Sequence, residues 1–245
     1  MKKVAIITGT SRGLGLSLAN LFLQDGYQVV GIARTNKFKH SDFYFFKWDL
    51  SSAKNPCAKL SSFLASKKIP FKMDHVVLVN NAATVMPIHF IDKLKEKEVQ
   101  LSYQLNLHTP MMISQWVLQK FLNKSTQVTI CNVSSGAAMR PFINWSIYCT
   151  MKAGLKMFTE CLNLEFSDSG KFKTFSFYPG VMDTQMQETI RKQNLKSFKN
   201  VEKFKELKEK NQLLDPQAVA VSLFNVIKSP SNITKIEYNA MDLLK

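Results

Sequence analysis

The sequence has few cysteines and no long hydrophobic run, and each shortage excludes a class of protein. Its four cysteines form no CxxC pair and no zinc-binding spacing, which predicts reduced thiols and no metal site. No apolar stretch approaches the ~18 residues of a membrane-spanning helix. The apolar start at 4–7 is cut short by Thr8 and Gly9 without a cleavage pattern, so no signal peptide is expected. We therefore expect a cytoplasmic protein with no metal ion.

Acidic residues are scarce as well. Eighteen Asp and Glu against 33 Lys and Arg give a formal net charge of +15 at pH 7. Such a charge suits nucleic acid or an anionic membrane, but the basic residues are spread along the chain. The densest segment, 191–210, interleaves lysines with Glu202, Glu206 and Glu209, as on an exposed helix. We expect a solvated surface with no nucleic-acid or membrane partner; a salt-dependent DNA shift at physiological ionic strength would favour the alternative.

Apolar stretches alternate with helical patterns along the whole chain, without a linker, repeat or low-complexity tract. The expected strands are 4–8, 29–33, 44–48, 76–80, 128–133 and 174–178, with 233–238 as a candidate edge strand. Helices are expected after the first strand and near 55–66, 96–122 and 146–167. This alternation predicts a parallel sheet with helices on both faces, in a doubly wound α/β fold. At 245 residues we expect a single domain over 1–245.

A glycine-rich turn follows the first strand. Gly9, Gly13 and Gly15 permit a tight turn, close approach of a pyrophosphate and packing of the next helix on the sheet. The amino end of that helix then offers free amide hydrogens and a positive dipole to phosphates. A bare strand–helix turn uses glycines too. The position between an apolar strand and an amphipathic helix favours a nucleotide site.

A tyrosine and a lysine are spaced to share one helix face. Tyr148 and Lys152 lie four residues apart, and Ser135 lies thirteen residues before the tyrosine, just past a predicted strand. A free tyrosine has a pKa of ~10, which a neighbouring ammonium should lower by favouring the phenolate. The phenol would protonate a carbonyl oxygen as hydride reaches the carbon, while Ser135 hydrogen-bonds that oxygen. Alone, a Tyr–Lys pair is usually a surface contact; the glycine turn upstream favours catalysis.

Together these motifs resemble the short-chain dehydrogenase/reductase family over nearly the whole chain. The resemblance implies hydride transfer between a nicotinamide and a carbonyl or alcohol, in a homodimer. It implies four catalytic residues: Asn106, Ser135, Tyr148 and Lys152. Asn106 would complete a proton relay through water, and Lys152 would also hold the nicotinamide ribose.

The resemblance also implies a coenzyme site. Asp49-Leu50 matches an adenine contact, although a turn or capping aspartate explains it too. Asn80-Asn81-Ala82-Ala83 is similar to the NNAG segment with alanine for the final glycine, and Val181 and Thr184 of a PGxxxT segment would hold the carboxamide. The expected coenzyme-binding residues are Gly9, Ser11, Arg12, Gly13, Leu14, Gly15, Arg34, Asp49, Leu50, Asn81, Ala82, Tyr148, Lys152, Val181 and Thr184.

Two arginines predict NADP(H) as the coenzyme. In NAD-using members of the family, the second strand typically ends in an acidic residue that accepts from the ribose hydroxyls. Here that strand ends in Arg34, with no carboxylate to repel a 2′-phosphate. Arg12 precedes Gly13 at a helix amino end, where the dipole disfavours a cation unless a phosphate lies between them.

Two stretches narrow the resemblance within the family. Residues 141–149 are similar to the approach to the catalytic tyrosine in sepiapterin reductases. Residues 183–187 are similar both to these and to bacterial benzil reductases that form (S)-benzoin, and 198–214 looks closer to the bacterial enzymes. The expected substrate is a ketone or vicinal dicarbonyl. The sequence names neither the physiological substrate nor the stereochemistry of its product.

The substrate side is expected within about 181–214. The expected substrate contacts are Ser135, Phe142, Trp145, Tyr148 and Met186, with Met139 in the same apolar wall. Plain core packing around the helix of Tyr148 explains the aromatic residues equally well. Glu237 falls near a substrate-anchoring carboxylate of sepiapterin reductases, with its role open. A rival function is a non-catalytic nucleotide sensor or scaffold on the same fold; it would have lost the tyrosine or the lysine, and both are present.

Overall fold

Seven strands form one parallel sheet in the order β3-β2-β1-β4-β5-β6-β7. The computed structural model describes residues 1–123, 125–194 and 198–245. The strands are β1 (Lys3–Thr8), β2 (Gln28–Ala33), β3 (Phe43–Lys47), β4 (His75–Asn80), β5 (Gln127–Val133), β6 (Phe172–Tyr178) and β7 (Glu237–Asn239). The strand order reverses between β1 and β4, and a parallel sheet opens a crevice at the carboxyl ends of such strands. The predicted α/β doubly wound fold is confirmed.

Six of the expected strands are confirmed to within two residues, and the seventh differs. β7 begins at Glu237, four residues later than the candidate edge strand at 233–238. Pro230 starts a 3-10 turn, Pro230–Asn232, directly before the segment in which a strand was expected. Pairing resumes only where the Ile236 carbonyl accepts from the Ser176 N–H at 2.8 Å.

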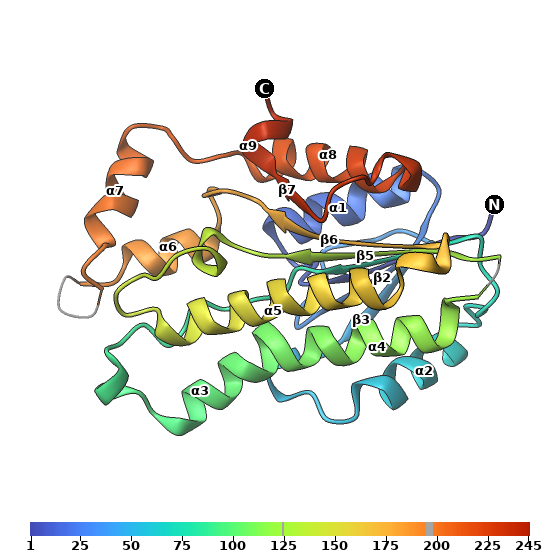
Figure 1. The fold of residues 1–245 in the computed structure, drawn as a ribbon, viewed down its shortest axis with the longest axis horizontal. Helices are drawn as coiled ribbons and strands as arrows, with labels where there is room; N and C mark the ends of the chain where they lie inside the picture. Colours follow the sequence, from blue (N-terminus) through green and yellow to red (C-terminus); the bar gives the residue numbers. More distant parts are fainter. Residues whose placement is uncertain (124, 195–197) are drawn as a thin grey trace.

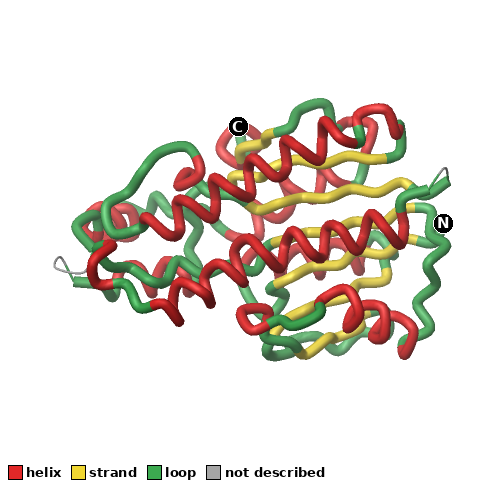
Figure 2. Tube along the Cα trace, turned by 60° about the horizontal axis from the view of Figure 1, so that its bottom comes forward, coloured by secondary structure: helices red, strands yellow, loops and turns green. Residues whose placement is uncertain are grey.

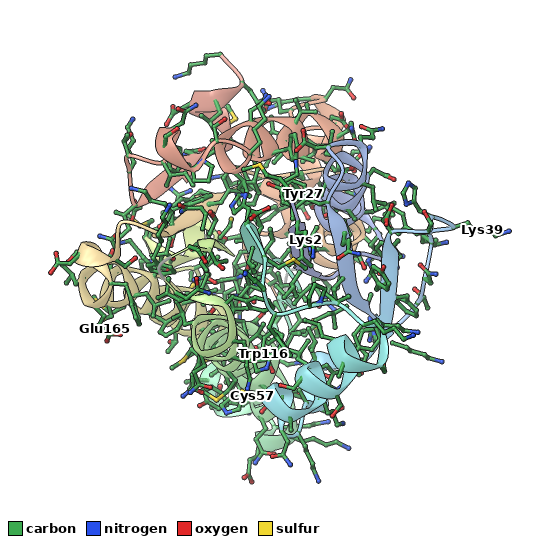
Figure 3. All side chains as sticks on the ribbon, turned by 90° about the vertical axis from the view of Figure 1, so that its right-hand side faces the viewer. Lys2, Tyr27, Lys39, Cys57, Trp116 and Glu165 are labelled. Atoms are coloured by element: carbon green, nitrogen blue, oxygen red, sulfur yellow. The ribbon has the colours of Figure 1, made fainter. Side chains whose placement is uncertain are left out.

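Helices cover both faces of the sheet because alternate strand residues point to opposite sides. Ala5 and Ile7 pack under α1 (Gly13–Gln24) and α8 (Pro216–Ile227). Val4 and Ile6 pack against the other layer, which consists of α2 (Pro56–Ser66), α4 (Thr109–Phe121) and α5 (Ser146–Glu165). Figure 1 shows the two layers above and below the sheet, and Figure 2 shows the long helices crossing the lower face. Figure 3 shows Tyr27 and Trp116, one in each core.

The helix expected over 96–122 is interrupted. The chain forms α3 (Glu96–Tyr103), a π-helical turn at Gln104–His108, and then α4. Pro110 has no N–H, so the carbonyl of Asn106 lacks the i+4 donor of a regular helix. The wider turn lets the N–H of Thr109 donate to the carbonyl of Gln104 instead.

A third cluster lies beyond the carboxyl ends of the strands. It is built on α6 (Gln185–Arg191) and α7 (Val201–Glu209), at the left of Figure 1. Its centre is Trp145, which stacks on Phe198 with ring centroids 4.9 Å apart.

The C-terminal helix α9 (Ala240–Leu243) follows β7 directly. No helix within the described residues is long and apolar enough to cross a membrane.

Candidate active site

A cleft of about 1090 Å3 runs along the carboxyl ends of the strands, where the strand order reverses. It extends from Arg34 and Asp49 at one end to Met186 and Phe204 at the other. The residues expected at the site that line this cleft are Gly9, Ser11, Arg12, Gly13, Leu14, Arg34, Asp49, Leu50, Asn81, Ala82, Ser135, Phe142, Trp145, Tyr148, Lys152, Val181, Thr184 and Met186. Gly15 and Asn106 do not line it and support it from behind.

The glycine turn has the conformation its sequence predicts. Gly9 and Gly13 adopt φ angles of +79° and +54°, a region that other residues rarely adopt. Gly15 has an ordinary φ but no room, since a Cβ there would lie 2.3 Å from the carbonyl oxygen of Gly9. Each glycine is required locally, two by conformation and one by close packing of α1 on the turn.

The amino end of α1 is open to an anion. Arg12 occupies its cap position without a capping hydrogen bond from its side chain, and the first turn contains no acidic residue. The N–H groups of this turn therefore face the cleft, where Gly13 and Leu14 lie. The guanidinium of Arg12 is exposed and donates to the side-chain oxygen of Gln185 at the start of α6. These features fit the diphosphate of a nicotinamide coenzyme.

Arg34 and Asp49 lie at the far end of the cleft. Arg34 is exposed at the end of β2. Asp49 caps a short 3-10 helix, Leu50–Ser52, because its carboxylate accepts from the N–H and hydroxyl of Ser51 at 3.0 and 2.6 Å. The Ser51 hydroxyl is the main cause that lowers the pKa of Asp49, and the charge of Arg34 adds a smaller effect. Asp49 thus has the capping position that the alternative interpretation expected, on the cleft wall.

The turn after β4 is tied to the turn after β1. The N–H groups of Asn81 and Ala82 both donate to the Thr8 hydroxyl at 2.9 Å. The Asn81 amide donates to the carbonyl of Thr8, also at 2.9 Å. These bonds fix the backbone of the Asn81-Ala82 segment beside the glycine turn, although alanine replaces the final glycine of the family pattern.

Tyr148, Lys152 and Ser135 converge in the middle of the cleft. The tyrosine and lysine are 5% and 3% exposed, and the Lys152 Nζ lies 5.9 Å from the centre of the tyrosine ring. Nζ donates to the carbonyl oxygen of Val133, the last residue of β5, at 2.7 Å. Ser135 begins a 3-10 turn, where its hydroxyl accepts from the N–H of Ala137 at 3.2 Å.

The acidities of these groups differ from the sequence-based expectation. Burial raises the pKa of Tyr148 to about 12, against a smaller lowering effect of the hydrogen bond with Ser135. Burial also lowers the pKa of Lys152 to about 8. The expectation that a neighbouring ammonium lowers the tyrosine pKa is therefore wrong for this state, because loss of solvent dominates. The phenol is protonated at neutral pH.

Asn106 lies behind the catalytic residues in the π-helical turn. Its side chain is fully engaged: the amide donates to the carbonyl of Thr84 and to the Ser102 hydroxyl, and its oxygen accepts from the Thr84 N–H. The amide therefore anchors the loop after β4. Pro110, four residues later, has no N–H to donate to the backbone carbonyl of Asn106.

The sequence left two roles open for the aromatic residues near Tyr148, core packing and a wall of the substrate site. The structure shows features of both. Trp145 is 4% exposed and contacts Tyr148 edge-to-face with ring centroids 5.4 Å apart, so it is core as well as wall. Phe142 and Met186 are half-buried and line the cleft, whereas Met139 is 60% exposed.

Several cleft residues were missed by sequence reasoning. Phe204 and Leu207 of α7 close the substrate end, and Gln187 of α6 is buried in its wall. Tyr178, directly before the PGxxxT segment, donates to Glu237 at 3.3 Å, and Glu237 pairs with Lys156 at 2.9 Å. The i+4 spacing of Lys152 and Lys156 on one helix face was the available signal for this cluster. In the part of the chain that the structure describes, no three His, Cys, Asp or Glu side chains form a metal-binding group.

Comparisons with known proteins agree with this geometry. A family model described as short chain dehydrogenase matches residues 3–195. A benzil reductase ((S)-benzoin forming) of Bacillus subtilis is 36% identical over 91% of this chain and 92% of its own length. One from Bacillus cereus is 32% identical over 93% and 94%. The crystal structure of the KRED1-Pglu enzyme superposes with a TM-score of 0.82 at 27% identity, covering 97% of this chain and all of that one. The resemblance drawn from the sequence, to the family and to benzil reductases, is confirmed.

Because Lys152 buries a charged ammonium, we expect that replacing it by an apolar residue stabilises the protein. In the absence of coenzyme, Lys152→Met should raise the free energy of unfolding at pH 7 by about 1–3 kcal/mol, because the variant buries no ammonium. The folded-state pKa of about 8 lies below the ordinary 10.5, so between these values the unfolded wild-type chain binds more protons. The free energy of unfolding of the wild type therefore rises with pH across this range. The difference in favour of Lys152→Met should shrink accordingly.

Urea unfolding at pH 7, 8 and 10 measures this difference in the free energy of unfolding between variant and wild type. Lys120→Met, at an exposed lysine of α4, is the matched control and should show no comparable pH-dependent gap. A Lys152→Met protein that is less stable than wild type at pH 7 would contradict the prediction.

Proposed function

The chain belongs to the short-chain dehydrogenase family and is an oxidoreductase, and on that premise we propose that it is an NADPH-dependent carbonyl reductase of vicinal dicarbonyls and ketones. The family uses nicotinamide coenzymes. The observation that carries the proposal is the convergence of Tyr148, Lys152 and Ser135 in one cleft with the glycine turn. A non-catalytic sensor would not need this buried, costly arrangement.

Tyr148 acts as the general acid. Its phenol keeps its proton at neutral pH and contacts the cleft, so it can donate to a carbonyl oxygen there. When bound, NADPH supplies a hydride to the carbonyl carbon. The π electron pair of the C=O bond moves to oxygen, which takes the phenolic proton, and the products are an alcohol and the oxidised coenzyme. Ser135 hydrogen-bonds the same oxygen.

Lys152 and Asn106 support the proton transfer. The ammonium of Lys152, close to the tyrosine ring, stabilises the phenolate that is left behind and binds the nicotinamide ribose. Pro110 offers no i+4 N–H to the backbone carbonyl of Asn106, which makes this carbonyl the group on the residue suited to hold a water of the relay. Protons from solvent would then return to Tyr148 along this route.

The coenzyme-binding residues are those expected from the sequence. The open amino end of α1 binds the diphosphate, Asp49 and Leu50 contact the adenine, and Val181 and Thr184 hold the carboxamide. Thr184 already contacts the glycine turn, since a Cβ on Gly13 would lie 3.3 Å from its methyl carbon. Arg12 and Arg34, both exposed and both on the cleft wall, select NADPH through its 2′-phosphate.

The substrate occupies the end of the cleft formed by 181–214, of which residues 195–197 lie outside the described part. Phe142, Trp145 and Met186 contact its apolar substituent, while Ser135 and Tyr148 hold its reacting oxygen. The name shared by the two Bacillus relatives supports an aryl diketone as the substrate class.

We also propose that the protein is a homodimer in the cytoplasm, as the family resemblance implies. Light scattering coupled to gel filtration tests the dimer. A nucleic-acid partner remains a poorer fit, because the net charge is spread over the surface.

Tyr148→Phe tests the mechanism. Phenylalanine keeps the buried ring but removes the acidic proton, so turnover should fall by ~10²-fold or more. Coenzyme affinity, measured by quenching of protein fluorescence, should stay within a few-fold of wild type and serves as the control for folding. Substantial turnover in this variant would exclude Tyr148 as the acid.

Arg34→Ala tests coenzyme choice. Charge-assisted bonds to a phosphate should give the wild-type protein a preference for NADPH of ~10²-fold in kcat/KM at fixed salt. The variant should raise the KM for NADPH and leave the kinetics with NADH nearly unchanged. Lys47→Ala removes an exposed cation at the end of the adjacent strand β3 that does not itself line the cleft, and should alter neither. A wild-type ratio near one, or equal losses with both coenzymes, would refute the role of Arg34.

A substrate panel tests the substrate class. Nicotinamide absorbance is followed with benzil, sepiapterin, an aldehyde and cyclohexanone. Benzil should show the highest kcat/KM, because each carbonyl activates the other and its rings bury apolar area at ~25 cal/mol per Å2. A clearly higher kcat/KM for sepiapterin or cyclohexanone than for benzil would refute the benzil-like assignment and leave the reductase assignment intact.

A further inference from the structure

Gln187 is a buried polar side chain in the cleft wall that has no role in the mechanism proposed above. It lies in α6, directly after Met186, and is 2% exposed. Neither its amide nitrogen nor its amide oxygen has a hydrogen-bond partner in the described part of the chain. Buried polar groups are nearly always paired, and leaving one unpaired is destabilising. A glutamine retained here at that cost points to a ligand that completes it.

The neighbouring wall offers more donors than acceptors. The indole N–H of Trp145 also lines the cleft and is buried without a partner among the described residues. Arg191, one turn beyond Gln187 on α6, also has a buried Nη1 without a partner among the described residues, but it does not line the cleft. Between Trp145 and Gln187, which both line the cleft, the unpaired groups are two donors and one acceptor, the amide oxygen of Gln187. The wall therefore suits an acceptor oxygen on the ligand.

That oxygen is a neutral one. Arg191 does not line the cleft, and it lies 4.0 Å from the carboxylate of Asp183, which also pairs with Lys208 at 2.6 Å. Trp145 and Gln187 contribute neutral donors. A ketone oxygen needs no counter-charge, whereas a carboxylate or phosphate would be left poorly neutralised in a buried wall.

The donor wall is in direct contact with the catalytic tyrosine. Trp145 packs edge-on against Tyr148, and Ile190 and Met186 of α6 belong to the same cluster as Trp145. A substrate that places one carbonyl oxygen at Tyr148 thus presents its adjoining atoms to this wall. In a vicinal dicarbonyl, the adjoining atom is the second carbonyl.

We propose that Gln187 is a specificity-determining residue that donates from Nε2 to the second carbonyl oxygen of a vicinal dicarbonyl, while Tyr148 and Ser135 hold the first. This inference rests on the proposed function and narrows its substrate class. The resulting hydrogen bond also fixes which of the two carbonyls faces the hydride, because the diketone is held at both oxygens.

Benzil and deoxybenzoin provide the test, since they share one skeleton and differ by the second carbonyl. The enzyme is assayed with NADPH as wild type, Gln187→Leu and Gln187→Met. Each variant should lower kcat/KM for benzil about tenfold, which corresponds to about 1.4 kcal/mol, and change that for deoxybenzoin less than twofold. Gln119→Leu, at an exposed glutamine of α4, is the matched control and should change neither.

Thermal unfolding without substrate separates recognition from a structural role. Replacing an unpaired buried amide by an apolar side chain should leave Tm unchanged or raise it. Equal losses with both substrates, or an unchanged ratio of the two in Leu and Met variants that retain the wild-type Tm, would overturn the inference and leave the reductase assignment standing. A wild-type protein that reduces neither compound nor any other carbonyl of the panel overturns the proposed function, and the inference with it.

Discussion

The hydrogen bond from Lys152 to the carbonyl of Val133 is the constraint on which the rest of the site depends. It joins the middle of α5 to the carboxyl end of β5 at 2.7 Å. Tyr148 lies one turn earlier on the same helix, and Ser135 follows Val133 by two residues, so one bond sets the approach of both groups. The bond comes with a buried ammonium, whose lowered pKa records the unfavourable loss of solvent. The charge is thus maintained against stability, at the position where the proposed mechanism uses it.

A second set of hydrogen bonds, between buried side chains, also connects α5 to the sheet. The buried amide of Asn80 in β4 donates to Asn132 in β5 at 2.8 Å, and Asn132 donates to the Thr159 hydroxyl at 2.9 Å. Thr159 lies seven residues after Lys152, which is two helical turns and therefore the same face of α5. The helix that carries Tyr148 is thus fixed to β5 at two points, and β5 is linked to β4 by the bond between Asn80 and Asn132. Directional bonds of this kind position a side chain more sharply than apolar packing alone, because packing tolerates sliding.

Local sequence patterns predicted the sheet and most of the expected residues that line the cleft, and long-range geometry explains what they missed. The strands could be predicted because buried parallel strands are short apolar runs, and the glycine turn because Gly9 and Gly13 need positive φ. The π turn at Asn106 escaped because the helical pattern continues through it, although Pro110 was a visible warning. Gln187 escaped because its significance is the absence of a partner among the described residues.

The acidity of Tyr148 decides the direction of the chemistry that the bare site favours. Sequence reasoning expected the ammonium of Lys152 to lower the tyrosine pKa, but both groups are buried, and desolvation disfavours the charged form of each. The result is a neutral phenol beside a lysine that loses its proton more readily than usual. A neutral phenol donates a proton, as reduction of a carbonyl requires, whereas oxidation of an alcohol would require the phenolate as a base. The low dielectric that makes the phenolate costly also strengthens its attraction to the ammonium once hydride has moved and the proton has been given up. Burial therefore keeps the acid protonated before the reaction and lets Lys152 stabilise its conjugate base afterwards, which supports the general-acid role proposed for Tyr148.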